Sequence, residues 1–322
     1  MSRGKARAHA NIALIKYWGK RDEELFLPMS SSLSLTLDSF YTETEVVFDS
    51  KLDRDYFYLN DKLQSEFQTK KISKFLDLFR IKKDIKYNAL IKSVNYVPTA
   101  AGLASSASGF AALAAAANVA SGLNLGEREL SIYARQGSGS ATRSIYGGFV
   151  EWREGNSSEN SYAVPIDDAK WDIGMVIVIV RKSKKEISSR EGMKRTVDTS
   201  PFYNAWVKSS KKDLMEIKKA IWDKDLEKLG AIAEANSLRM HATMFGARPP
   251  IIYFKPETIQ VMEIVKDLRS DGIPCYFTMD AGPNVKIICR LSQSKIIKDR
   301  LKERFEDEQI IISGPGPGIS YL

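Results

Sequence analysis

The chain has 322 residues, of which 43% are hydrophobic and 27% charged, a composition typical of a folded protein with two domains that share a cleft. No run approaches 18 apolar residues and the N-terminus MSRGKARAHA lacks the apolar segment of a signal peptide, so we expect a cytoplasmic protein with no membrane partner. Lys plus Arg number 48 and Asp plus Glu 40, and the net charge of +8 favours anionic partners.

The first half of the chain is predicted to form one layer of strands and helices. Alternation of apolar and polar residues predicts strands, and apolar residues at helical spacing predict helices. The predicted strands cover 6–15, 42–49, 88–97 and 149–152, and the predicted helices cover 71–80, the alanine-rich stretch after 105, and 129–136. Residues 16–24, between the first two strands, read as a polar and aromatic loop.

The second half begins with MVIVIV at 175–180, a run of β-branched residues suited to a strand buried on both faces. Further helices are predicted at 212–222, 225–242, 256–270 and 293–306, and strands at 273–279, 284–290 and 310–313. A change in composition near residue 180 predicts a boundary between domains 1–180 and 181–322. Cys275 and Cys289, the two cysteines, are expected to be buried packing residues without a disulfide.

The stretch PTAAGLASSASG, residues 98–109, has the order of strand, tight loop and helix N-terminus. Pro98 ends a strand, Gly102 can adopt a positive φ, and Ser105 and Ser106 fall in the first turn of the next helix. Free amide groups, the helix dipole and serine hydroxyls at such a position suit a polyphosphate or a magnesium ion. The alternative is a serine-capped helix whose alanines simply pack tightly.

A second glycine- and serine-rich stretch, GSGSATR at 137–143, offers the same kind of anion site. Its glycines and serines supply amides and hydroxyls, and Arg143 adds a fork that can bind a carboxylate or phosphate through two hydrogen bonds. The alternative is a turn between helices with a surface arginine. Two such sites favour two anionic ligands.

Two further stretches carry candidate polar residues. Asp280 follows an apolar strand and precedes Ala-Gly-Pro, so it is either a carboxylate at a strand end facing a site or an ordinary turn residue. ALIKYWGKRD places Tyr17, Lys16 and Lys20 in a predicted loop, which could equally be an ordinary basic loop. The two histidines, at 9 and 241, have no metal-ligand spacing and are expected to be structural.

Five stretches together resemble the mevalonate diphosphate decarboxylases of the GHMP kinase superfamily. They are NIALIKYWGK, PTAAGLASSASG, GSGSATRSIYGGF, SSREGMKRT and CYFTMDAGPNVK, and they follow one another along nearly the whole chain. The resemblance implies an α+β GHMP kinase fold of two domains with the active site in the cleft between them. It also implies a homodimer that uses ATP and Mg²⁺ to convert mevalonate diphosphate to isopentenyl diphosphate, ADP, phosphate and carbon dioxide.

The resemblance also implies roles for single residues. Asp280 would act on the substrate 3-hydroxyl as general base or orienting anion, Arg143 would face the substrate carboxylate, and Ser105 and Ser106 would act on the phosphates, with Ser106 binding the metal. ATP would be held by Ala101, Gly102, Leu103, Ala104, Ser105, Ser106, Lys185, Ser189 and Lys71. Mevalonate diphosphate would contact Tyr17, Lys20, Ser138, Gly139, Ser140, Arg143, Arg190 and Met193.

Two alternatives to this function stay open at this point. A related enzyme on the same scaffold could phosphorylate mevalonate or decarboxylate mevalonate monophosphate. Such an enzyme would differ only in how its pocket binds the terminal phosphate of the substrate. A nucleic-acid-binding protein is the more remote alternative, because the chain is basic and the superfamily shares its N-terminal fold with a ribosomal protein domain. The modest excess of positive charge and the small-anion loops favour the enzyme, with no nucleic-acid partner.

Overall fold

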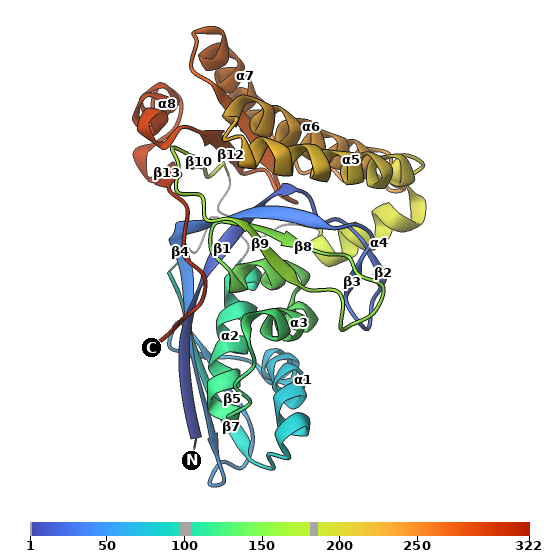
Figure 1. Ribbon diagram of the computed structural model, residues 1–322, viewed down its shortest axis with the longest axis vertical. Coiled ribbons are helices and arrows are strands. Elements are labelled where there is room, and N and C mark those ends of the chain that lie inside the picture. The colour runs from blue at the N-terminus through green and yellow to red at the C-terminus, as the bar shows by residue number, and fades with distance from the viewer. Residues whose placement is uncertain (1, 97–104, 181–185) are drawn as a thin grey trace.

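The computed structural model describes residues 2–96, 105–180 and 186–322, which form two main sheets and a small two-stranded one, with helices packed around them (Figure 1). The larger sheet is built on two long antiparallel strands, β1 (Ser2–Ile15) and β4 (Ser32–Asp49). Its other strands are β5 (Tyr56–Leu59), β6 (Lys62–Leu63), β7 (Asn88–Tyr96), β8 (Phe149–Trp152), β9 (Ala163–Asp167) and β14 (Ser320–Tyr321). Helices on mixed sheets confirm the predicted α+β class.

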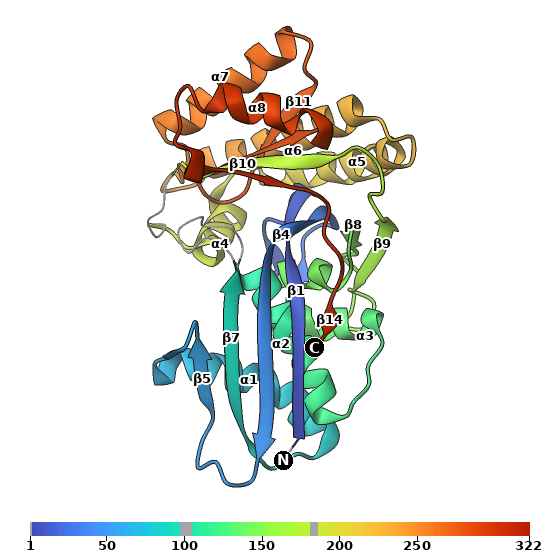
Figure 2. The same ribbon diagram turned by 90° about the vertical axis from the view of Figure 1, so that its left-hand side faces the viewer.

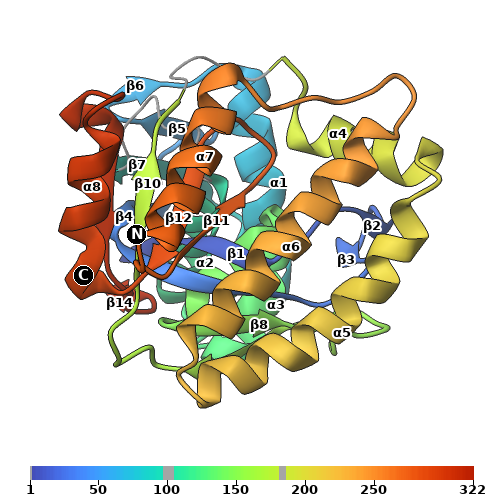
Figure 3. The same cartoon turned by 90° about the horizontal axis from the view of Figure 1, so that it is seen from above.

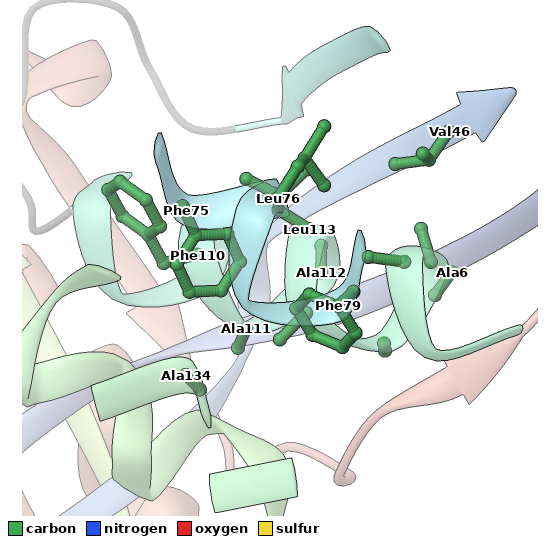
Figure 4. Close-up of a cluster of buried hydrophobic side chains, with 14 of the residues drawn as sticks. Ala6, Val46, Phe75, Leu76, Phe79, Phe110, Ala111, Ala112, Leu113 and Ala134 are labelled. Atoms are coloured by element: carbon green, nitrogen blue, oxygen red, sulfur yellow. The ribbon is translucent and has the colours of Figure 1, made fainter. Parts of the chain in front are cut away.

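Three helices cover one face of the larger sheet (Figure 2). They are α1 (Glu66–Lys83), α2 (Ser105–Ser121) and α3 (Glu127–Gly137). The alanines of α2 allow close packing on β1: a Cβ added to Gly4 would lie 2.2 Å from the main-chain oxygen of Ala116. On its other side α2 meets α1, where the rings of Phe75 and Phe110 are 5.2 Å apart (Figure 4). This packing fixes the position of the N-terminus of α2.

The smaller sheet has four strands in the order β11, β12, β10, β13. Their bounds are Cys275–Met279 for β11, Val285–Cys289 for β12, Gly174–Val178 for β10 and Ile310–Ser313 for β13. Around it lie α5 (Tyr203–Trp222), α6 (Leu226–Phe245), α7 (Pro256–Ser270) and α8 (Ser294–Leu301), seen from above in Figure 3. Cys275 and Cys289 lie opposite one another in β11 and β12, buried and free, as predicted.

One apolar core joins the two sheets. It contains Ile12 and Leu14 of β1, Ile177 of β10, Ile217 of α5 and Leu229 of α6, all at most 1% exposed. Helix α6 contacts both β1 and β11. The C-terminal end of β1 is therefore held close to the C-terminal end of β11, where Asp280 follows.

The end of the chain returns to the larger sheet. Gly316 accepts a hydrogen bond from the main-chain N–H of Gly148 at 3.1 Å and donates one to the carbonyl of Thr36 at 2.8 Å, and β14 then pairs with β1. The division at residue 180 stays a prediction. In the structure, β10 before that residue pairs within the smaller sheet, and β14 beyond it pairs within the larger one.

The structure adds elements that the sequence pattern did not predict. Most of the stretch GSGSATR, expected to be an anion site or a turn between two helices, lies in a 3-10 helix, η1 (Gly139–Ile145). Helix α4 (Ser189–Thr199) is mostly polar, and Met193 and Val197, its two large apolar residues, form too short a stripe to predict a helix. The Ser188 side chain caps it by accepting from the N–H of Glu191. The remaining short elements are β2 (Lys20–Asp22), β3 (Leu27–Pro28), η2 (Leu291–Gln293) and η3 (Asp307–Gln309).

Among the residues that the structure describes, no helix combines the length and the apolar character that crossing a membrane requires.

Both histidines are buried in the fold. The ring of His9 lies with Nδ1 3.1 Å from the carbonyl oxygen of Leu37. His241 of α6 is 1% exposed and packs against the ring of Phe254 at 4.6 Å between centroids, and neither of its ring nitrogens makes a hydrogen bond to a described residue. Burial, together with the nearby Lys16 ammonium, lowers the pKa of His241 to about 3.

This burial predicts a loss of stability in acid. Between pH 6.5 and about 3 the unfolded chain binds a proton at His241 that the folded protein does not bind, so stability falls as pH falls. The expected contribution is roughly 1 kcal/mol for each pH unit in that range. Urea unfolding at pH 7, 6 and 5 should show a shallower loss for His241→Leu than for the wild-type protein. Parallel losses in the two proteins would contradict this account.

Candidate active site

The candidate site is built around Asp280, which lies directly after β11 at the edge of the smaller sheet. Helix α6 fixes the strand end: the hydroxyl of Ser237 donates to the carbonyl of Met279 at 3.0 Å and accepts from its N–H at 2.8 Å. The turn that follows is closed by a hydrogen bond from the N–H of Gly282 to the carbonyl of Asp280. Asp280 is thus a rigidly placed carboxylate at the end of a strand.

Two buried lysines hold this carboxylate, one on each oxygen. The ammonium of Lys16, just after β1, lies 2.9 Å from Oδ1, and that of Lys286, in β12, lies 3.1 Å from Oδ2. The side chains of the lysines are 2% and 4% exposed, whereas that of Asp280 is 35% exposed. The two ammonium groups therefore hold the carboxylate on its buried side, and its other side remains accessible.

The lysines decide the charge state of Asp280. Burial alone would raise the pKa of its carboxyl group, but the ammonium groups of Lys16 and Lys286 outweigh burial and hold that pKa well below its usual range. Burial lowers the pKa of Lys16 to about 8, even though Asp280 acts in the opposite direction. Near neutral pH Asp280 is therefore an ionised carboxylate between the two lysine side chains.

Arg143 lies in η1 and is 2% exposed. Its Nη1 donates to the hydroxyl of Ser32 at 2.5 Å and its Nε to the side-chain oxygen of Asn11 at 3.4 Å. Asn11 is itself fixed, because its Nδ2 donates to the carbonyl of Ser140 and the hydroxyl of Ser144. Burial lowers the pKa of Arg143 to about 10, which leaves the guanidinium charged at neutral pH, and both of these partners are neutral.

The stretch Ser138–Ser140 runs from the end of α3 into η1 and presents two hydroxyls beside the first turn of α2. The hydroxyls of Ser138 and Ser140 are 3.2 Å apart, and that of Ser138 donates to the hydroxyl of Ser106 at 3.4 Å. Gly139 leaves no room for a side chain, because a Cβ there would lie 2.8 Å from the ring of Trp152 and 2.9 Å from that of Tyr17. Burial raises the pKa of Tyr17, so its hydroxyl remains a neutral donor.

These groups converge on one cavity of about 180 Å³, here called the reaction cavity. Its lining residues are Asn11, Ala13, Lys16, Tyr17, Trp18, Ser106, Ser138, Ser140, Arg143, Ser189, Met193, Met240, Asp280 and Ala281. They come from β1 and the loop after it, from α2, α4 and α6, from η1 and the residue before it, and from the turn after β11. Asp280 is the one acidic residue among them, so the lining carries more positive than negative charge and suits an anion.

A second cavity of about 160 Å³ adjoins the first at Ser106; we call it the apolar cavity. It is lined by Thr42, Phe57, Leu59, Ile72, Ser93, Asn95, Ser106, Gly109, Phe110 and Leu113. Ser106, the second residue of α2, is exposed and lines both cavities. A ligand could therefore extend from one cavity to the other across the positive end of the α2 dipole.

The structure does not bring all the predicted residues into the reaction cavity. The ammonium of Lys20 lies 2.6 Å from a carboxylate oxygen of Glu23 and 4.2 Å from the ring centre of Phe26. Lys71 and Arg190 line a larger, neighbouring cavity of about 960 Å³, where burial and the charge of Arg190 lower the pKa of Lys71. Ala101, Gly102, Leu103, Ala104 and Lys185 lie outside the described residues, as does the side chain of Ser105.

Sequence reasoning missed several residues of the site. Lys16 was noted only as a cation in a loop, and Lys286, Asn11 and Ser32 were not singled out. Lys286 had a usable signal, because it interrupts the apolar strand NVKIIC and a buried lysine is rare without a partner. Asn11 had none, since its role depends on contacts with residues about 130 positions away.

Family models match both halves of the chain. The diphosphomevalonate decarboxylase-like N-terminal domain matches residues 8–163, and the mevalonate 5-diphosphate decarboxylase C-terminal domain matches residues 175–313. The diphosphomevalonate decarboxylase of Candida albicans is 37% identical over 297 residues, which cover 87% of this chain and 82% of that protein.

Solved structures agree with this assignment. Mevalonate diphosphate decarboxylase from Staphylococcus aureus is 50% identical with a TM-score of 0.97, over 100% of this chain and 98% of the other. A structure described as "MDDEF in complex with MVAPP, AMPPCP and Magnesium" is 53% identical with a TM-score of 0.95, over 100% and 99% of the two chains. This chain, with its carboxylate, arginine and serine stretch gathered in one cavity, belongs to the diphosphomevalonate decarboxylase family.

Proposed function

We propose that the protein catalyses the ATP-dependent decarboxylation of mevalonate 5-diphosphate to isopentenyl diphosphate. One observation carries the proposal: Asp280, Arg143 and the Ser138–Ser140 stretch face one positively charged cavity that opens to the N-terminus of α2. This substrate requires a group that accepts a hydrogen bond from its hydroxyl, a cation that pairs with its carboxylate, and a site for its phosphates. The names of the relatives and the ligands of the similar structure support the same reaction.

The chemistry explains why ATP is needed. Decarboxylation of a 3-hydroxy acid leaves an electron pair with no carbonyl group or cofactor to receive it. Phosphorylation of the tertiary hydroxyl turns it into a leaving group. When the phosphate departs, the electrons of the broken carbon–carbon bond form the alkene, and carbon dioxide is released.

Each described residue then has a role in binding or proton transfer. The oxygens of Asp280 that face the cavity accept the hydrogen bond of the 3-hydroxyl and receive its proton as the oxygen–phosphorus bond forms and ADP leaves. Arg143 pairs with the substrate carboxylate, because its present partners are neutral and a buried charge favours an anionic partner. The hydroxyls of Ser138 and Ser140 donate to the diphosphate, and Tyr17 and Met193 line the substrate pocket beside them.

The nucleotide would lie across the N-terminus of α2. We place its phosphates at Ser105 and Ser106 beside the reaction cavity and its base in the apolar cavity, which Ser106 also lines. Among the described residues no group of three or more acidic, histidine or cysteine side chains could hold a metal. The exposed Ser106 hydroxyl fits a Mg²⁺ ion held mainly by phosphates and water, and such an ion neutralises phosphate charge when bound.

Lys20, Lys71 and Arg190 lie outside the reaction cavity and remain proposed ligand residues. Lys185 and residues 101–104, also proposed, lie outside the described residues. A ligand phosphate would have to replace Glu23 as the partner of Lys20. We also propose a cytoplasmic homodimer, for which sedimentation of the purified protein is the direct test.

Product analysis tests the function. Incubation with mevalonate diphosphate and Mg-ATP should give ADP and carbon dioxide in equal amounts, because one phosphoryl transfer precedes each decarboxylation. ADP without carbon dioxide would favour a plain mevalonate kinase, and turnover restricted to the monophosphate would favour the monophosphate decarboxylase. Carbon dioxide release without ATP would rule the proposal out.

Asp280→Asn tests the role of the carboxylate. The amide has nearly the same shape but cannot take the hydroxyl proton, so turnover should fall by about 10²–10⁴-fold while both ligands still bind. Asp172→Asn is the matched control: Asp172 accepts hydrogen bonds from Ser292 and does not line the reaction cavity, and its replacement should leave turnover unchanged. An Asp280→Asn variant that kept more than about a tenth of wild-type turnover would refute the assignment.

A further inference from the structure

Lys286 occupies an unusual place for a lysine. It lies in β12, which pairs with β11 on one side and β10 on the other, and its cross-strand neighbours are Thr278 and Ile177. The residue is 3% exposed, and the other four residues of β12 are apolar or cysteine. A charged group at the centre of a sheet is costly unless it has a partner. Its partners are the Oδ2 of Asp280 at 3.1 Å and the carbonyl of Asn284 at 3.3 Å.

The hydrogen bonds of both lysines fix the orientation of Asp280. Lys16 donates to Oδ1 and to the carbonyl of Ala13 at 2.7 Å, so that ammonium, like the one of Lys286, is anchored to the main chain. Each carboxylate oxygen accepts one ammonium and retains a second lone pair. Because the ammonium groups are buried and the carboxylate is partly exposed, these free lone pairs face the reaction cavity.

We propose that Lys286 is a positioning residue for phosphoryl transfer: its ammonium keeps Asp280 ionised and oriented toward the hydroxyl that receives the phosphoryl group. This rests on the proposed function of the cavity. Among the residues that the structure describes, the charged and titratable groups around Asp280 are Lys16 just after β1, Lys286 in β12, Arg143 in η1 and His241 in α6. Removal of Lys286 leaves Oδ2 of Asp280 without its partner. It also weakens the positive electrostatic potential that keeps the carboxyl group of Asp280 ionised.

The role predicts an effect on turnover rather than on binding. Lys286→Met keeps most of the length of the side chain and removes the charge. We expect kcat to fall about 10- to 100-fold, as for a reacting group that is no longer held in place, with KM for both substrates within about threefold of wild type. The acidic limb of the kcat profile should move to higher pH, because the carboxyl group of Asp280 binds a proton more readily.

The matched control is Lys218→Met. Lys218 of α5 pairs with the buried carboxylate of Glu151 at 3.0 Å, a half-buried ion pair that does not line the reaction cavity. This control removes the same charge elsewhere, so kcat and its pH profile should be unchanged. A loss of kcat in both variants would overturn the proposal, because the effect would then come from charge or stability alone.

A carboxyl-carbon NMR titration gives a readout that does not require activity. The signal of Asp280 is assigned by its loss in Asp280→Asn. In the wild-type protein it should titrate below the usual aspartate value of about 3.9, and in Lys286→Met its midpoint should rise by about one to three pH units. A wild-type midpoint at the usual aspartate value would overturn the proposal, even if the variant did not fold. A folded Lys286→Met variant with an unchanged midpoint and a normal kcat would also overturn it. If the wild type released no carbon dioxide, the function would fail and the titration would still report on Lys286.

Discussion

The ion pair between Lys16 and Asp280 is the interaction on which the site depends, because it joins the two sheets. Lys16 follows β1 of the larger sheet, and Asp280 follows β11 of the smaller one. Helix α6 supports both ends: the side-chain oxygen of Asn236 accepts from the N–H of Lys16, and Ser237 binds the main chain of Met279. Adjacent residues of one helix therefore align the carboxylate with the serine and arginine side chains of η1, which contacts the larger sheet.

This geometry gives the site an excess of buried positive charge. Lys16, Lys286 and Arg143 bring three buried cations to one carboxylate, and the hydrogen-bond partners of Arg143 are neutral. Burying cations in excess is unfavourable without an anion to balance them. The substrate carries a carboxylate and a diphosphate, and the nucleotide a triphosphate, so the site is completed by its ligands. An ionised Asp280 is a weak base, which agrees with proton transfer during phosphoryl transfer rather than before it.

Local patterns predicted the parts of the site that lie in glycine- and serine-rich stretches. Ser138, Ser140 and Arg143 lie in a stretch predicted from its glycines and serines to bind an anion. The strand-end position of Asp280 left its role open, and the family resemblance assigned it. All four residues line the reaction cavity. The ion pairs that hold Asp280 could not be predicted from the sequence. Lys16 and Asp280 are 264 residues apart in sequence, and no local pattern pairs them. Helix α4 was missed because it is short and has few apolar residues, and η1 because its residues are mostly small or polar. Periodicity predicted strands and helices in both halves of the chain, and the α+β class came from the family resemblance.

A crystal structure with mevalonate diphosphate and a non-hydrolysable ATP analogue tests the central claim most directly. The account predicts the 3-hydroxyl within hydrogen-bond reach of Asp280, about 2.6–3.2 Å between oxygens, with the substrate carboxylate against Arg143 and the nucleotide base in the apolar cavity. A hydroxyl turned away from Asp280, with the carboxylate bound elsewhere than at Arg143, would contradict it.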